Sequence, residues 1–192
     1  MREILPGVHH WTSFHEPIGM DVSSYFVAPA GVAIDPKAPS EDLPGDVEQV
    51  VLTIGLHNRD ATQVADAHDA TIRAPREAEH RELAFVYEPY SDGDELAPGV
   101  TAIQIGAICP DEYALHIAVG EGAIAFADGL IHYGGSLAFV PDGLLGDDPE
   151  GVKDGLREAF RELLTRDFDH LLFAHGDPLI GGGKAALREF VG

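Results

Sequence analysis

The hydrophobic pattern along the chain consists mainly of short runs of apolar, β-branched and aromatic residues, which predict β-strands. Val50–Thr53 is a continuous run, as in a strand buried on both faces. Turn signals at Ala28–Gly31 and Gly120–Gly122 predict hairpins between neighbouring runs. Two polar segments predict loops, Pro89–Pro98 and Val140–Asp148. The predicted strands are Val8–Phe14, Ser24–Val27, Val32–Ile34, Val50–Thr53, Thr71–Ala74, Leu83–Val86, Val100–Ile105, Ala114–Val119, Ala123–Ala127 and Asp169–Phe173.

Helical spacing of apolar residues is confined to a few segments. The longest of them places Val152, Leu156 and Phe160 on one face, and Asp147 and Asp148 precede its first residue as candidate caps. Proline at the first position of this segment suits the start of a helix. The predicted helices are Ala61–Ala70, Pro149–Leu164 and Gly183–Val191.

The order of these elements bears on the fold class. Several strands precede a helix, several more follow it, and a helix, a strand and a last helix complete the chain. Hairpins between buried strands argue against simple alternation of strand and helix. Two mixed sheets covered by outer helices fit better. We therefore expect an α+β fold of one domain over residues 1–192, a four-layer αββα sandwich.

Composition narrows the classes of function. The chain has 192 residues, 33 acidic and 12 basic, for a formal charge of −21. Such a surface lacks the basic patch that nucleic acids or anionic lipids require. No apolar run approaches the roughly 20 residues that span a bilayer, and the first residues do not resemble a signal peptide. The single Cys109 fits a reducing compartment. We expect a cytoplasmic protein with neither nucleic acid nor membrane as a partner.

Three metal-competent side chains follow predicted buried strands. His57 comes after Val50–Thr53, Asp128 after Ala123–Ala127, and His175 after Asp169–Phe173. Loops at strand ends are where α/β proteins gather active groups. Imidazole and carboxylate ligands suit Zn, Mn or Fe. The alternative is that each residue only forms a turn or caps a helix.

Two residues close to His57 are candidate catalytic groups. Arg59 can clamp a carboxylate or phosphate with its planar guanidinium, or it can simply pair with one of many acids. Asp60 can assist at the metal, as can Glu112.

Four segments together resemble the metallo-β-lactamase-fold hydrolase family. Val22–Pro36 (VSSYFVAPAGVAIDP) is similar to the opening hairpin of that family, which ends in an Asp. Leu52–Asp60 (LTIGLHNRD) lies where the family has the metal motif Thr-His-x-His-x-Asp-His. Phe126–Leu130 (FADGL) resembles the strand ending in a metal-bridging Asp, and Phe173–Pro178 (FAHGDP) the strand ending in a metal-binding His. The resemblance implies the αββα fold and a site at the sheet edges.

The sequence also departs from that family. Ile54 and Leu56 stand where the first two histidines follow Thr53. The His expected before Thr-Pro-Gly is missing near Ile108–Asp111, where Cys109, Asp111 and Glu112 are its nearest replacements. The resemblance therefore implies a depleted site that holds one metal ion, with His57, Asp128 and His175 as its ligands.

Two functions remain open at this point. The first is a metal-dependent hydrolase of a small substrate, with one divalent ion of Zn, Fe or Mn. The second is a metal-free member that binds a ligand or partner through the same cleft. Ile54 and Leu56 favour the second, whereas the three polar strand ends favour the first. The helix at Pro149–Leu164 can in addition serve a homodimer, although its apolar face more simply covers the sheet.

Overall fold

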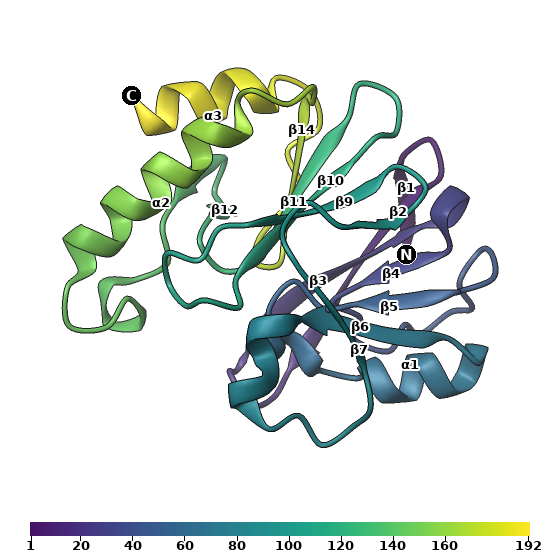
Figure 1. The fold of residues 1–192 in the computed structure, drawn as a ribbon. Coiled ribbons are helices and arrows are strands. Elements are labelled where there is room, and N and C mark those ends of the chain that lie inside the picture. Colours follow the sequence, from purple (N-terminus) through teal and green to yellow (C-terminus); the bar gives the residue numbers. More distant parts are fainter.

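A computed structural model describes residues 1–192, which form a four-layer sandwich of two mixed β-sheets between outer helices (Figure 1). The first sheet has seven strands in sequence order. Its first four strands pair antiparallel and the remaining ones pair parallel. Its strands are β1 (Arg2–Leu5), β2 (Val8–His15), β3 (Met20–Val27), β4 (Val32–Ile34), β5 (Gln49–Val51), β6 (Thr71–Pro75) and β7 (Glu88–Tyr90).

The second sheet has five strands in the order β14-β11-β10-β9-β8. All its pairs are antiparallel except β11 with β14, which run parallel. A separate two-stranded hairpin, β12 with β13, follows β11 along the chain. The bounds are β8 (Glu95–Ala97), β9 (Val100–Gln104), β10 (Tyr113–Ile117), β11 (Ala123–Phe126), β12 (Ile131–Tyr133), β13 (Ser136–Ala138) and β14 (His170–Phe173).

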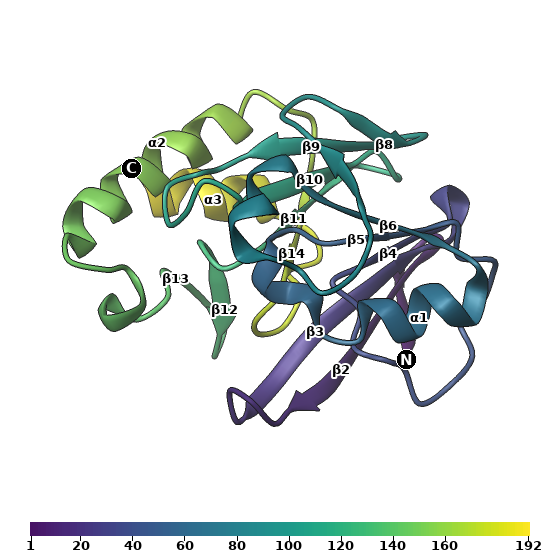
Figure 2. The same cartoon turned by 60° about the horizontal axis from the view of Figure 1, so that its bottom comes forward.

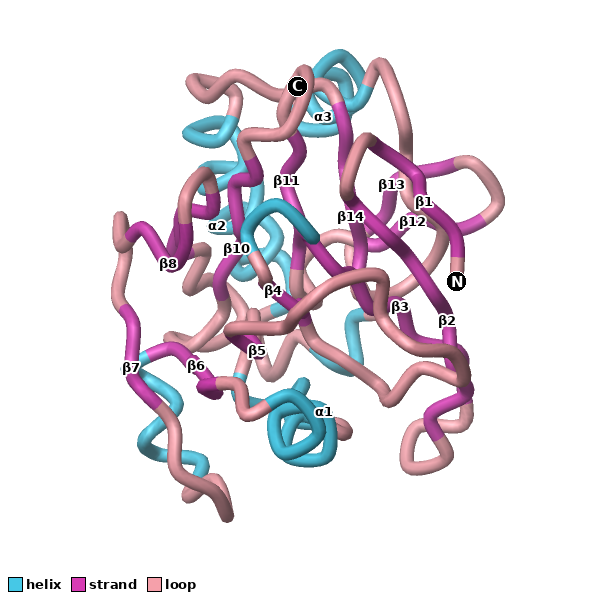
Figure 3. Tube along the Cα trace, turned by 90° about the vertical axis from the view of Figure 1, so that its right-hand side faces the viewer, coloured by secondary structure: helices cyan, strands magenta, loops and turns pink.

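Helices cover the outer face of each sheet. Helix α1 (Ala61–His68) packs against β5 and β6, whereas α2 (Pro149–Leu163) and α3 (Gly183–Val191) cover the second sheet (Figure 2). Seen from the side, α1 lies on the opposite side of the molecule from α2 and α3 (Figure 3). No helix is both long enough and apolar enough to cross a membrane.

Three apolar clusters hold these layers together. The largest lies between the sheets and joins residues such as Tyr25 and Val51 to Leu115 and Leu172. The other two lie beneath α1 and beneath the α2–α3 pair. Burying apolar surface on both faces of each sheet is the main stabilising contribution to the fold. It also explains why interior strands such as β4 and β11 are apolar throughout.

The predicted αββα architecture is confirmed, and most elements lie where the pattern placed them. Helix α3 has the predicted bounds, and α2 begins at Pro149. Asp148 is the residue that caps α2, since its Oδ1 accepts a hydrogen bond from the Gly151 N–H at 3.1 Å. Gly120–Gly122 joins the antiparallel strands β10 and β11, as expected for a hairpin.

The predicted strand at Leu83–Val86 is wrong. These residues form no strand, although their side chains alternate between half-buried and exposed. Leu83 and Phe85 pack against the apolar cluster beneath α1, whereas Val86 is 93% exposed. The alternation therefore reflects side-chain packing, and no neighbouring strand pairs with this segment. The predicted loop Pro89–Pro98 contains β8 and most of β7. The short strands β1, β12 and β13 were not predicted because they carry too few apolar residues.

Candidate metal centre

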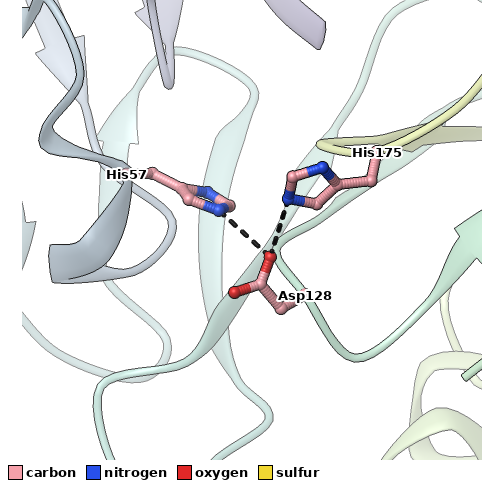
Figure 4. A group of neighbouring side chains, drawn as sticks. All are labelled: His57, Asp128 and His175. Atoms are coloured by element: carbon pink, nitrogen blue, oxygen red, sulfur yellow. Dashed lines mark hydrogen bonds and ion pairs between the residues drawn. The ribbon is translucent and has the colours of Figure 1, made fainter. Parts of the chain in front are cut away.

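His57, Asp128 and His175 meet at one edge of the two sheets (Figure 4). Asp128 and His175 follow the parallel neighbours β11 and β14, so both emerge at the same edge of the second sheet. His57 lies in a 3₁₀ turn, Gly55–Asn58, shortly after β5 of the first sheet. Packing of the sheets face to face then brings His57 to the other two residues.

The three side chains converge on a single carboxylate oxygen. Nε2 of His57 and Nε2 of His175 each lie 3.1 Å from Oδ1 of Asp128 (Figure 4). One potential ligand atom from each residue lies within 4.8 Å of the other two. Asp128 remains 23% exposed, so solvent or a small molecule reaches the group from its side.

This group of atoms fits a single divalent ion. Two imidazole nitrogens and a carboxylate oxygen are a donor set used for Zn, Fe and Mn. In tetrahedral geometry, metal–ligand bonds of about 2.0–2.2 Å place ligand atoms about 3.3–3.6 Å apart, slightly farther than the two observed separations of 3.1 Å. Nδ1 of His175 is buried without a hydrogen-bond partner, so no other protein group competes for the orientation of this ring. The role of the three residues as metal ligands stays a prediction.

A buried carboxylate contacts the ring nitrogen of His57 that does not face Asp128. Oδ2 of Asp35, directly after β4, lies 2.9 Å from Nδ1 of His57. The same carboxylate accepts hydrogen bonds from the backbone N–H of Thr53 at 2.8 Å and from the Thr53 hydroxyl at 2.5 Å. His57 therefore lies between two carboxylates, one on each ring nitrogen.

Electrostatics follow from this arrangement. Burial alone lowers the pKa of His57, but the carboxylates of Asp128 and Asp35 outweigh it and raise the pKa to about 9. Burial disfavours the charged form of Asp128 as well, yet His57 and His175 hold its pKa far below the ordinary value. Without a metal ion, His57 is therefore an imidazolium at neutral pH that bridges Asp35 and Asp128.

Arg59 lies against the backbone beside this group and forms no ion pair with a surface acid. Its Nη1 donates to the carbonyl oxygens of Ser23 and Asp35, both at 2.7 Å, and its Nη2 is buried without a partner. The backbone of Arg59 has φ +33°, a conformation that costs energy for a residue with a side chain. Its charge thus lies close to Asp35 and Asp128.

Asp60 does not join the three converging residues. Its carboxylate accepts hydrogen bonds from Nζ of Lys37 at 2.8 Å and from the backbone N–H of Ala38 at 2.9 Å. It directly precedes α1. The predicted catalytic role of Asp60 therefore has no support from its contacts, which tie the Lys37 segment to the start of α1.

Glu112 and Cys109, near the position of the missing histidine, do not join the three converging residues either. Glu112 is buried, and its carboxylate accepts hydrogen bonds from the N–H groups of Gly129 at 2.7 Å and Ile108 at 3.3 Å. Burial raises its pKa to about 7. Glu112 thus supports the turn after Asp128 and lies outside the group of three donors. Cys109 is half-buried, and burial raises the pKa of its thiol to about 12, which argues against a nucleophile.

Two residues that support the site were not among the predicted site residues, although the position of His132 after Asp128 indicated that it could line the same edge. Asp35 ends the hairpin segment, but no local pattern links it to a histidine 22 positions away. His132 holds the segment after β14: its backbone N–H donates to the His175 carbonyl at 3.3 Å, and its carbonyl accepts from the Asp177 N–H at 3.1 Å. Only the position of His132 shortly after Asp128 could have indicated this contact.

Comparison with known proteins agrees with this architecture. A family model described as the metallo-beta-lactamase superfamily matches residues 2–191. No curated protein matches the sequence.

Solved structures resemble the chain over almost its whole length. A metallo-beta-lactamase family protein from Thermus thermophilus is 14% identical with a TM-score of 0.68, covering 98% of this chain and 79% of that one. A beta-lactamase domain protein from Burkholderia ambifaria is 16% identical with a TM-score of 0.67, covering 98% and 75%. A metallo-beta-lactamase from Hirschia baltica is 12% identical with a TM-score of 0.65, covering 99% and 94%. At these identities the likeness shows the fold alone.

Proposed function

The chain belongs to the metallo-beta-lactamase superfamily, and from this premise we propose that it is a metal-dependent hydrolase of a small substrate with a single-ion site. The ligands are Nε2 of His57, Nε2 of His175 and the carboxylate of Asp128. The observation that carries the proposal is the convergence of these atoms within 4.8 Å, from three strand ends and two sheets. A cluster of titratable groups with perturbed pKa values at an accessible edge is a candidate for a functional site.

One ion is proposed, and not two, because further donors are absent around the group. Ile54 is buried and Leu56 is 59% exposed, and neither side chain offers a ligand atom. Glu112 is engaged with backbone N–H groups. Three protein ligands leave positions open for water or substrate, as catalytic sites require.

The bound ion would supply a water molecule with a pKa lowered to about 7, a nucleophile suited to ester, amide or phosphoester bonds. The protein itself contributes orientation and charge. Asp35 holds the ring of His57, and Arg59 fixes the carbonyl oxygens of Ser23 and Asp35 behind it. The exposed side of Asp128 leaves room for substrate.

A metal-free binding protein is the second candidate, and one observation favours it. The charges at the site are already balanced without a metal ion. The negative charges of Asp35 and Asp128 are offset by the imidazolium of His57 and the guanidinium of Arg59. A protein of this kind would bind a small ligand at the same edge and would show no turnover.

Metal analysis and a substrate panel distinguish the two candidates. Untagged protein prepared without chelator is analysed for metals, soaked with Zn(II), Fe(II) or Mn(II), and assayed on lactams, thioesters, lactones and phosphoesters. We expect about one equivalent of metal and turnover that a chelator abolishes.

Substitution variants complete this test. His175→Ala should lose the metal and the turnover, whereas His68→Ala, at an exposed histidine of α1, should keep both. Less than about a tenth of an equivalent of metal, with no gain on soaking, contradicts the hydrolase proposal.

A further inference from the structure

The carboxylate of Asp35 is the most constrained polar group around the site. Asp35 is 3% exposed. Oδ1 accepts the Thr53 N–H at 2.8 Å, and Oδ2 accepts the Thr53 hydroxyl at 2.5 Å and faces Nδ1 of His57 at 2.9 Å. The backbone N–H of Thr53 can only donate, so this carboxylate is placed as a hydrogen-bond acceptor.

An ionised carboxylate can only accept hydrogen bonds. Nδ1 of His57 must therefore carry the hydrogen of this contact. In the neutral ring, the lone pair then lies on Nε2, the nitrogen that faces Asp128 at 3.1 Å. Nε2 is the His57 nitrogen that faces Asp128 (Figure 4). Tautomer and ring direction are thus set by the same contact.

We propose that Asp35 is a positioning residue that selects the His57 tautomer able to bind a divalent cation through Nε2. The inference rests on the proposed function, because it concerns the same site. Asp35 does not touch the ion. It acts through His57, the one histidine in the segment where the family has its first two histidines at the positions of Ile54 and Leu56.

Asp35 also supports the turn that carries His57 through its hydrogen bonds to Thr53. This structural role must be separated from the effect on the tautomer. Asp111 offers the comparison, because it is a fully buried carboxylate that holds the same turn. It accepts the Gly55 N–H at 3.0 Å and pairs with Arg81. No hydrogen bond or ion pair joins Asp111 to His57. Asparagine at position 111 can still accept the Gly55 N–H through its amide oxygen, so this variant removes a carboxylate beside the turn without changing a partner of the histidine.

The test compares Asp35→Asn with Asp111→Asn. In Asp35→Asn the amide oxygen must face the Thr53 N–H, which can only donate. The amide NH₂ then faces His57, so Nδ1 becomes an acceptor and the ring hydrogen moves to Nε2. We expect the Zn(II) dissociation constant, measured by competition with a chromophoric chelator, to rise 10- to 100-fold in Asp35→Asn. Asp111→Asn should leave it unchanged within error.

Nitrogen-15 NMR of the histidine rings shows which ring nitrogen carries the hydrogen, and structural support of the turn alone would not change this. The metal-free protein is measured at alkaline pH, where imidazole rings are neutral. We expect the hydrogen on Nδ1 in the wild type and in Asp111→Asn, and on Nε2 in Asp35→Asn. The wild-type spectrum needs no variant, so the proposal stays testable where Asp35→Asn fails to fold.

Each outcome has one meaning. A wild-type ring with its hydrogen on Nε2 overturns the inference, as do equal losses of Zn(II) affinity in the two variants or unchanged affinity in Asp35→Asn. Failure of the wild type to bind Zn(II), Fe(II) or Mn(II) overturns the proposed function and this inference with it. Zn(II) binding by the wild type with a selective loss in Asp35→Asn supports both.

Discussion

Nε2 of His57 lies 3.1 Å from Oδ1 of Asp128, although the two residues are 71 positions apart and follow strands of different sheets. No local interaction along the chain can produce this contact. It exists because the interior between the sheets, with Tyr25 and Leu115 in its core, fixes how one sheet lies on the other. The site is therefore sensitive to changes in the segments that join the sheets.

Gly176 is one such position, directly after His175. It has φ +99°, and a Cβ placed there would lie 2.0 Å from the His132 carbonyl oxygen. Gly176→Ala should therefore lower the free energy of unfolding by about 3 kcal/mol or more and displace His175. Urea denaturation followed by fluorescence measures the loss.

The control for this substitution is Gly135→Ala. Gly135 also has positive φ, at +79°, but no atom lies within 4 Å of its added Cβ. It should lose only the backbone strain, about 1–2 kcal/mol. Equal losses at the two positions would show that the contact with His132 is unimportant.

His10 should make the protein less stable in mild acid. Burial is the largest cause that lowers its pKa, from 6.5 to about 4, with Arg2 adding to the effect. Above pH 6.5 the ring is neutral in both states, and as the pH falls toward 4 the unfolded chain binds a proton first. The free energy of unfolding should therefore fall by about 3 kcal/mol over this window.

Urea unfolding between these two pH values checks the prediction, with two variants beside the wild type. His10→Phe cannot titrate and should have a flatter profile. His68→Gln, at an exposed histidine, should keep the wild-type slope. A His10→Phe profile parallel to that of the wild type would count against the assignment.

His57 should act in the opposite direction in the metal-free protein. Its pKa is raised in the folded state to about 9, because Asp128 and Asp35 outweigh burial. The stabilisation from its charge is complete below about 6.5 and is lost as the pH rises through 9. Asp128→Asn removes the larger of the two attractions, so it should reduce this alkaline loss. Urea unfolding in the presence of chelator at several pH values tests this prediction. If Asp128→Asn lost as much unfolding free energy at alkaline pH as the wild type, Asp128 would not be the main cause of the raised pKa of His57.

Asp148 should contribute to helix stability through its side chain alone. Its carboxylate caps α2 by accepting the Gly151 N–H. Asp148→Ala should cost about 1 kcal/mol of unfolding free energy. Asp147→Ala removes another exposed acid, one residue earlier, that does not cap the helix, and it should cost much less. Similar losses from both would mean that net charge, and not capping, is responsible. Thermal or urea unfolding of both variants provides the measurement.

Local patterns along the chain were enough to predict most elements and the class of fold. Apolar runs such as Val50–Thr53 and the capped start of α2 are properties of a few consecutive residues, and the local backbone follows them. The strand predicted at Leu83–Val86 fails for the converse reason, because a strand needs a partner that the local pattern does not contain. Position at a strand end also distinguishes His57, Asp128 and His175 from most other histidines and acids of the chain.

Which polar groups meet, in contrast, depends on how the chain folds. Asp35 and Asp60 are both acids near the same turn, yet one faces His57 and the other faces Lys37. Arg59 lies two positions after His57 in sequence, and its guanidinium donates to backbone carbonyls and not to a surface acid. The physical reason is that hydrogen bonds and ion pairs act over about 3–4 Å. Which groups come that close depends on how the two sheets pack, and not on their spacing along the chain.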